Sequence, residues 1–330
     1  MVKLLEKGLV MEEAQIRRYI NDSFHVLTLI LLIMIILGIM TWAGVTKCSA
    51  IPGWCSVYYL FAGEPNILIV YGETGLGDPF LLEKAIENPE YLGKRAEMVQ
   101  LKNISPGLLK NYKLVIVDRA KKMSTEEISL FIDYVSEGGK LVWIGDSGTE
   151  PYDTDLMLLE SDRSPGMADT EIGPWARKQI KDDANYSVDL DKLLSVSFIG
   201  NYCDIKTCGD EFPFIGYFRK APGPTHDLVK GLDPRFEMRA DFSVVKKRLD
   251  KYNNEVLTVD AFSAIIDEKG LVKPKGTNYG DVFSIIMVSS ASGLGETIVY
   301  FAVPPETFSM EGQPNKTFLF VENMYYALLE

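Results

Sequence analysis

The sequence predicts an α/β protein with a doubly wound, mostly parallel sheet, an antiparallel C-terminal extension and one transmembrane helix ahead of the sheet. Three observations support this. An uncharged apolar run lies near the N-terminus, short Ile- and Val-rich runs alternate with helical periodicity over 66–150, and later apolar runs are joined by a Gly-rich turn. The 330 residues are enough for an anchor and one large domain.

The apolar run is "VLTLILLIMIILGIMTWAGV", residues 26–45. It carries no charge, and a helix of about 20 such residues crosses a hydrocarbon core of roughly 30 Å. A buried core helix would normally keep a polar face. A cleaved signal peptide would have a shorter apolar core nearer the start, although "AGVTKCSA" offers small residues for cleavage. The run therefore predicts a transmembrane helix, with the lipid bilayer as its partner.

Basic residues predict the orientation of this helix. Lys3, Lys7, Arg17 and Arg18 precede the run, and within the next dozen residues only Lys47 follows it. The positive-inside rule then puts residues 1–25 in the cytoplasm. The sequence predicts a single-pass signal-anchor protein of the cell membrane, with a juxtamembrane linker over 46–65 and an extracytoplasmic domain over 66–330.

The first half of the domain reads as alternating strands and helices. Strands are expected in "NILIVYGE", "AEMVQLK", "YKLVIVDRA" and "KLVWIGD", whose continuous apolar runs are typical of a parallel sheet covered on both faces. A helix in "PFLLEKAIEN" has Asp78 as its cap and Pro79 in its first turn. A second helix has capping-box spacing between Ser124 and Glu127 and ends at Gly138.

The second half is less regular. Residues 151–190 are polar and predict a surface insertion, in which "GPWARKQIKDDANYS" fits a helix. "KLLSVSFIGNY" predicts a helix followed by a strand. Strands are expected in "PFIGYFRK" and "VLTVDAFSAIID", a hairpin in "DVFSIIMVSSASGLGETIVYFAVPPE", and a closing helix in "NKTFLFVENMYYALLE".

Cysteines and sequons agree with an exported domain. Cys48 lies near Cys55 and Cys203 lies near Cys208, so two local disulfides are favoured on the outer side. Free thiols remain an alternative. Zinc is disfavoured because the spacings are not CxxC and only one histidine lies outside. Glycosylation sequons stand at Asn103, Asn185 and Asn315.

The net charge of −12 excludes a typical nucleic-acid binder, which needs a basic face. The acidic balance fits cationic partners or simple solubility.

Three segments resemble the class I glutamine amidotransferase-like superfamily. "YKLVIVDRAKKMSTEEISLFIDYVSEGGKLVWIGD" is similar to its strand–helix–strand unit, "PGPTHDLVKGLD" to its "HPIT.GL" segment, and "GETIVYFAVPPETF" to its ending. The resemblance covers roughly 66–150 and 222–330 and implies a flavodoxin-like sheet. Membrane-anchored members include the auxiliary proteins of gliding-type ABC transporters.

Active members of that superfamily carry a cysteine at the turn after a central strand. The matching turn here is "IGDSG", which has no cysteine. The resemblance therefore implies a pseudoenzyme: a non-enzymatic binding or scaffold subunit of a cell-envelope or transport-associated complex, with protein partner subunits in the membrane.

The carboxyl ends of the strands predict a binding crevice. Its candidate residues are Glu73, Thr74, Asp118, Asp146 and Ser147. The carboxylates have the chemistry of a divalent-cation site but equally that of caps and turns. "GETGLGD" is neither GxGxxG nor a Walker loop, and Glu73 would repel a phosphate. No metal and no cofactor are expected.

Ser147 raises the alternative of an enzyme. A nucleophilic serine needs a base, and His226 is the only histidine outside. The tetrapeptide Gly-Asp-Ser-Gly does not fit the elbow pattern G-x-S-x-G, so a tight turn is the favoured interpretation. The rival function is an extracytoplasmic hydrolase that acts on envelope material from the strand-end crevice.

Overall fold

The computed structural model describes residues 2–42, 51, 53–63, 66–155, 174–181, 184–205, 214–220, 225–232, 237–238, 240–248, 254–266, 272–290, 296–307 and 318–329. The chain divides into two compact units. One comprises residues 1–64 with Glu330, and the other residues 65–329.

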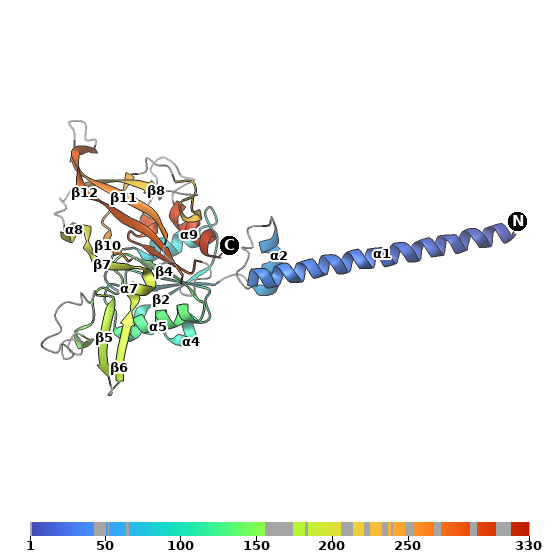
Figure 1. The fold of residues 1–330 in the computed structure, drawn as a ribbon, viewed down its shortest axis with the longest axis horizontal. Coiled ribbons are helices and arrows are strands. Elements are labelled where there is room, and N and C mark those ends of the chain that lie inside the picture. Colours follow the sequence, from blue (N-terminus) through green and yellow to red (C-terminus); the bar gives the residue numbers. More distant parts are fainter. Residues whose placement is uncertain are drawn as a thin grey trace. The chain divides into compact units, whose positions relative to one another are not determined.

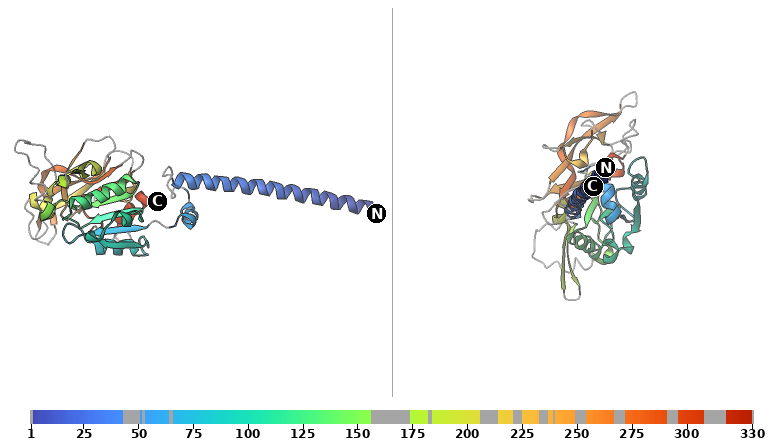
Figure 2. Two further views of the ribbon diagram at one scale, coloured as in Figure 1. Left: turned by 90° about the horizontal axis from the view of Figure 1, so that it is seen from below. Right: turned by 90° about the vertical axis from the view of Figure 1, so that its right-hand side faces the viewer.

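The first unit is built on one long helix, α1 (Val2–Trp42), seen from the side in the left view of Figure 2 and along its axis in the right view. Within it, Asn21–Thr41 is long and apolar enough to cross a membrane. Within α1, residues 2–25 are continuous with the apolar run, and no proline interrupts the helix. The apolar stretch starts slightly before the predicted 26–45, and residues 43–45 lie outside the described part.

The predicted linker 46–65 contains a second helix, α2 (Trp54–Ala62). Gly53 precedes it with φ of 78° and Gly63 ends it with φ of 74°, values that favour glycine. The Trp54 indole Nε1 donates to Thr41 Oγ1 at 2.9 Å, so the start of α2 is bonded to the end of α1.

The second unit contains a nine-stranded sheet in the order β2-β1-β3-β4-β13-β12-β11-β8-β9. The first five strands of this order, β2-β1-β3-β4-β13, pair parallel with one another. From β13 to β9 each neighbouring pair is antiparallel. An α/β fold with a largely parallel core is therefore confirmed. The strands are β1 (Ile67–Tyr71), β2 (Ala96–Gln100), β3 (Leu114–Asp118), β4 (Lys140–Ile144), β8 (Phe214–Lys220), β9 (Glu237–Met238), β11 (Asn254–Ile266), β12 (Val272–Ser289) and β13 (Ile298–Phe301).

Helices cover both faces of the parallel half (Figure 1). The helices of this unit are α3 (Pro79–Glu87), α4 (Pro106–Leu109), α5 (Thr125–Ser136), α7 (Leu190–Leu194), α8 (Tyr202–Ile205), which packs with β7, and α9 (Leu319–Leu329), with 3-10 turns η2 (Leu101–Asn103), η3 (Asp227–Val229) and η4 (Pro305–Thr307). The caps are confirmed: Asp78 accepts from the amides of Phe80 and Leu81, and Ser124 forms a full capping box with Glu127. Helix α3 packs with α9, and α4 packs with α5.

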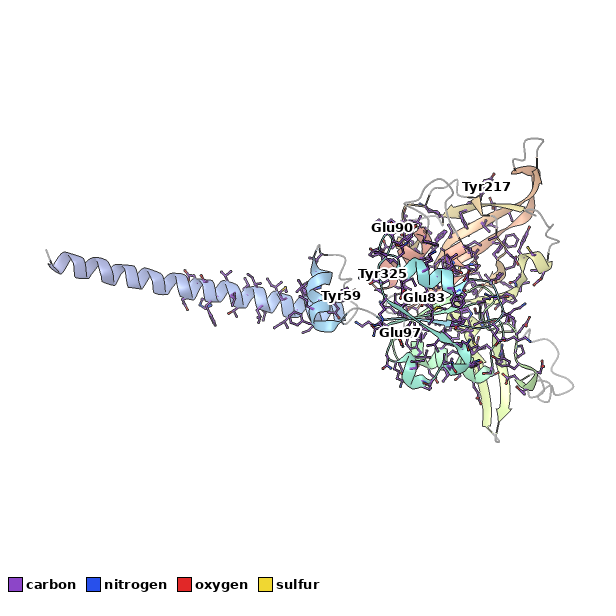
Figure 3. All side chains as sticks on the ribbon, turned by 180° about the vertical axis from the view of Figure 1, so that it is seen from behind. Tyr59, Glu83, Glu90, Glu97, Tyr217 and Tyr325 are labelled. Carbon is purple, nitrogen blue, oxygen red and sulfur yellow. The ribbon has the colours of Figure 1, made fainter. Side chains whose placement is uncertain are left out.

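Strand β13 has two different neighbours. It pairs antiparallel with β12, which confirms the hairpin, and parallel with β4, where Ile298 stands opposite Leu141. All four of its residues are buried, as are those of β3. Side chains therefore fill the layers on both sides of the sheet (Figure 3). As a consequence, residues after β13 emerge at the same edge as residues after β4.

Residues 174–189 differ from the prediction. The expected helix is instead an antiparallel hairpin of β5 (Ala176–Lys181) and β6 (Ala184–Asp189). At its base Trp175 and Arg177 are buried, so this end of the predicted surface insertion contributes to the core. A separate pair, β7 (Val196–Asn201) with β10 (Ser243–Lys247), packs beside β12.

Candidate functional site

Loops after four parallel strands meet at one edge of the sheet. The amide of Lys121, after β3, donates to Thr74 O at 2.8 Å in the loop after β1. The amide of Gly148, after β4, donates to Ala120 O at 2.8 Å. The loop after β13 reaches the first loop through Glu306, whose Oε1 accepts from the Asp78 amide at 2.8 Å. We call the strand-end site the cluster of Asp78, Asp118, Asp146, Ser147 and Glu306.

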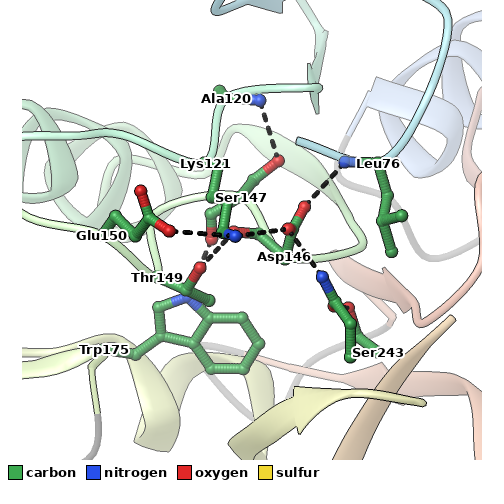
Figure 4. Close-up of polar contacts among 10 residues, drawn as sticks. Leu76, Ala120, Lys121, Asp146, Ser147, Thr149, Glu150, Trp175 and Ser243 are labelled. Atoms are coloured by element: carbon green, nitrogen blue, oxygen red, sulfur yellow. Dashed lines mark hydrogen bonds and ion pairs between the residues drawn. The ribbon is translucent and has the colours of Figure 1, made fainter. Parts of the chain in front are cut away.

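Asp146 is buried and fully occupied by structural bonds (Figure 4). Its Oδ1 accepts from the Leu76 amide at 2.8 Å, and its Oδ2 accepts from Asn201 Nδ2 at 3.0 Å. Lys121 Nζ lies 3.8 Å from Oδ2 and 2.9 Å from Glu150 Oε1, and the hydrogen bond to Glu150 is the first cause of the raised pKa of Lys121. Asp146 therefore ties the loops after β1 and β4 to the end of β7.

Ser147 is also held by structural bonds. Its Oγ accepts from the Ala120 amide at 3.3 Å, and its carbonyl accepts from the indoles of Trp143 and Trp175 at 2.9 and 2.8 Å. The residue is fully buried. This geometry is that of a tight turn, the interpretation of Gly-Asp-Ser-Gly that the sequence favoured.

The structure does not bring His226 to Ser147. His226 Nε2 lies 2.8 Å from Glu296 Oε2, and Nδ1 accepts from the Leu228 amide at 3.2 Å. Glu296 precedes β13, which runs parallel to β4, whereas Ser147 follows β4. The two side chains therefore stand at opposite ends of the sheet, and no Ser147–His226 pair forms.

Asp118, at the end of β3, has no such partners. Its side chain is fully buried, and neither carboxylate oxygen accepts a hydrogen bond from the residues that the structure describes. Burial, followed by the charge of Glu306, raises its pKa well above the usual range, and the neighbouring Arg119 amide offsets only part of that rise. The Gly77 backbone lies against it: a Cβ on Gly77 would stand 1.9 Å from Asp118 Oδ1.

Glu306, in η4, is the second acid of the strand-end site that is buried with an unpaired carboxylate oxygen. It is 1% exposed, and its Oε2 has no partner among the described residues. Burial, together with the charge of Asp78, raises the pKa of Glu306 to about 7. At neutral pH a substantial part of this carboxyl is therefore protonated.

The other predicted crevice residues lie outside this pair. Glu73 and Thr74 are exposed on the loop after β1. Arg119, between Asp118 and Ala120, has φ of 51°, a strained backbone for a residue other than glycine. Within the described ranges no group of three or more His, Cys, Asp or Glu side chains has a metal-binding arrangement.

Arg177 binds the loop after β4 and two other segments through their backbone carbonyls. Its NH1 donates to Met123 O at 2.6 Å, its NH2 to Gly148 O at 2.7 Å and its Nε to Pro174 O at 2.9 Å. The guanidinium is 3% exposed, and burial lowers its pKa to about 10.

Replacing Arg177 with methionine is expected to lower the free energy of unfolding by about 3 kcal/mol, because two buried carbonyls and one partly buried carbonyl lose charged donors. Urea unfolding of the full chain in detergent, followed by tryptophan fluorescence, measures this. The control is Arg95→Met, which removes an exposed ion pair with Glu97 and should cost under about 1 kcal/mol. Equal losses would contradict the role given to Arg177.

Sequence reasoning missed Glu306, Arg177 and Asn201. Glu306 sits in "VPPETF", directly after an apolar strand, as Asp118 and Asp146 do. The position of Glu306 after an apolar strand was visible in the sequence. Placing Glu306 at the strand-end site also required knowing that β13 runs parallel to β4.

Cysteines and sequons are only partly within the described residues. Cys203 is disulfide-bonded, and its partner is not among the side chains that the structure describes. Cys48 and Cys208 fall outside the described residues, and Cys55 lies in α2. Asn103 is exposed in η2, Asn185 lies in β6, and Asn315 falls outside. The local pairings and glycosylation stay predictions.

Among known proteins, similarity to this chain is found only in solved structures. No protein-family model matches the chain, and no curated protein matches it. A ThuA-like protein from Bacteroides uniformis has a TM-score of 0.46 at 16% identity, covering 81% of this chain and 93% of its own. A β-galactosidase from Rahnella sp. R3 has 0.46 at 14%, covering 82% and 33%. The carbohydrate deacetylase Agd3 has 0.43 at 11%, covering 80% and 32%. The chain thus spans about a third of the length of the β-galactosidase and of the carbohydrate deacetylase.

These findings correct the amidotransferase prediction. The matching structures named above are described as a ThuA-like protein, a β-galactosidase and a carbohydrate deacetylase, and none of the three is described as a class I glutamine amidotransferase. The prediction of that superfamily is wrong. The pseudoenzyme and scaffold interpretation is wrong with it, because it depended on a cysteine that only that superfamily requires.

Proposed function

We propose that the chain is a single-pass membrane protein whose domain acts outside the cytoplasm as a hydrolase on cell-envelope material. The observation that carries this proposal is the pair of buried carboxyls, Asp118 and Glu306, at the carboxyl ends of two parallel strands. Strongly perturbed carboxyls at the strand ends of an α/β sheet are a frequent mark of catalytic sites.

The pair has the acid–base chemistry that hydrolysis needs. Two neighbouring carboxyls that resist joint ionisation titrate together, so one can be protonated while the other is charged. The charged carboxylate takes a proton from a water molecule, whose oxygen attacks the scissile bond. The protonated carboxyl gives its proton to the leaving oxygen. Burial raises the pKa of Asp118 well above its usual range, so Asp118 keeps its proton and is the donor. Glu306, whose pKa is about 7, is the carboxyl that becomes charged near neutral pH.

Access to the pair requires movement of the loop Gly72–Asp78. Asp118 and Glu306 are 0% and 1% exposed, and this loop contacts both. Asp78 and Glu73 lie exposed on the same loop, where they would line the opening. Substrate binding would therefore displace this loop from Asp118 while Asp146 keeps its hinge at Leu76 in place.

The strand order supports a flavodoxin-like assignment for the parallel half. The order β2-β1-β3-β4-β13 corresponds to 2-1-3-4-5, and in that arrangement ligands bind outside the carboxyl ends of the strands. The basic residues before α1's apolar stretch support a cytoplasmic N-terminus and an extracytoplasmic domain over 66–330.

Saccharides are the substrate class to test first, because several matching structures are named as acting on carbohydrate. The full chain in detergent is incubated with chromogenic glycosides and acetylated oligosaccharides, and product release is measured between pH 5 and 9. We expect turnover that rises as pH increases past about 7, because Glu306 then loses its proton and becomes the base. Asp118→Asn and Glu306→Gln should each lower the rate by about 10²- to 10⁴-fold.

Glu90→Gln and Asp133→Asn are the matched controls, since both remove exposed carboxylates away from the strand-end site. They should leave the rate unchanged. The proposal would be overturned if Asp118→Asn and Glu306→Gln both kept the rate of the parent chain. It would also be overturned if the parent chain turned over neither substrate class.

A further inference from the structure

Helix α2 exposes large apolar side chains beside the candidate membrane span. Leu60 is 81% exposed and Phe61 is 87% exposed, the two highest values among the exposed large apolar residues of the described chain. The stretch "IPGWCSVYYLFAG" around them carries no charge. In water such a surface would be costly, so it requires an apolar partner.

The position of α2 within its own unit fixes where that partner lies. Trp54 is bonded to Thr41, the last residue of the candidate span Asn21–Thr41. Figure 1 and Figure 3 show α2 lying across the end of α1 rather than continuing it. When α1 crosses a bilayer, α2 therefore lies along the membrane plane at the level where the span ends.

The composition of α2 suits that level. Its 9 residues rise about 14 Å, far less than the roughly 30 Å hydrocarbon core, so α2 cannot span. Trp54, Tyr58 and Tyr59 form a run of neighbouring rings, with centroids 6.4 Å and 5.8 Å apart. Tryptophan and tyrosine are enriched at membrane–water interfaces because their rings are apolar and their N–H and O–H groups remain hydrated.

We propose that α2 is an interfacial helix that inserts Leu60 and Phe61 into the lipid leaflet at the C-terminal end of α1. The proposal rests on the membrane-spanning role of α1 and is independent of the hydrolase proposal. The helix and the span together form an L-shaped anchor, in which α2 lies in the plane of the bilayer and α1 crosses it.

Site-directed spin labelling of the full chain in phospholipid vesicles tests this. No cysteine in the described part of the chain is a free thiol, so Phe61→Cys supplies the site for a nitroxide, and unsubstituted protein reports background labelling. Collisions with oxygen, which concentrates in lipid, are compared with collisions with a water-soluble nickel chelate. We expect the oxygen-to-nickel ratio at residue 61 to shift strongly toward oxygen.

Two further labels separate the possible outcomes. Phe80→Cys labels an exposed phenylalanine of α3 in the other unit, and its ratio should favour nickel. Ile33→Cys labels the exposed middle of α1, and its ratio should favour oxygen if α1 spans. A nickel-favouring ratio at 61 with an oxygen-favouring one at 33 overturns the interfacial helix alone. Shielding of residue 61 from both reagents also overturns it, because protein would then cover α2. A nickel-favouring ratio at 33 overturns the span itself.

Discussion

Replacing Gly77 with alanine is expected to lower the free energy of unfolding by about 4 kcal/mol. Two effects add. Gly77 has φ of +116°, which side chains rarely adopt, and the new methyl group would stand 1.9 Å from Asp118 Oδ1 and 2.8 Å from its Cγ. Asp118 is buried between the sheet and the loop, so it has no room to withdraw. Chemical unfolding of the full chain in detergent, followed by near-UV circular dichroism, measures the loss.

Gly138 provides a matched control for that substitution. It has φ of +98°, but a Cβ there would meet nothing within 4 Å, so Gly138→Ala carries the backbone strain without the collision. We expect it to cost about 1 kcal/mol. The double variant Gly77→Ala/Asp118→Ala should recover part of the loss, as a double-mutant cycle would reveal. Equal losses at both glycines would contradict the close approach of the loop to Asp118.

The stability of the domain is expected to fall as pH rises from about 4.5 to about 7. The pKa of Glu306 is about 7 in the folded protein and near the ordinary glutamate value of 4.5 once unfolded. Between these values the folded form binds more protons than the unfolded form, so the free energy of unfolding decreases with pH. The difference amounts to about 3 kcal/mol for Glu306, and Asp118 acts in the same direction.

Glu306→Gln should flatten this pH dependence, because the amide remains neutral and still accepts from the Asp78 amide. Unfolding midpoints at pH 5 and pH 8 for the variant and the parent chain measure the difference. Glu90→Gln, at an exposed glutamate, should keep the slope of the parent chain. A parent chain that becomes more stable from pH 5 to pH 8, with Glu306→Gln changing nothing, would refute the burial of a protonated acid.

The sequence was sufficient for the elements but not for the chemistry of the site. Continuous apolar runs located β1, β3 and β4, and Asp118 and Asp146 were predicted at their ends for that reason. On sequence alone the two aspartates look alike. Their difference arises from the Leu76 amide, which lies far along the chain and satisfies Asp146 but not Asp118.

Charged and late residues were harder to place. Arg177 looked like a surface residue because its guanidinium is charged, and its burial becomes favourable only through the carbonyls of Met123 and Gly148, which lie far from it in the sequence. Glu306 was missed because its position depends on the parallel pairing of β13 with β4, which joins segments far apart in the sequence. Local patterns do not encode such pairing.

The parallel pairing of β13 with β4 also sets an order of assembly. A ribosome makes β4 before β13, so the edge of β4 stays unpaired until residues 298–301 have been synthesised. An exposed, largely apolar strand edge invites pairing with other chains. The strand-end site can form only after residue 306 has emerged, and a nascent or truncated chain that stops earlier would leave an unpaired β4 edge that other chains can join.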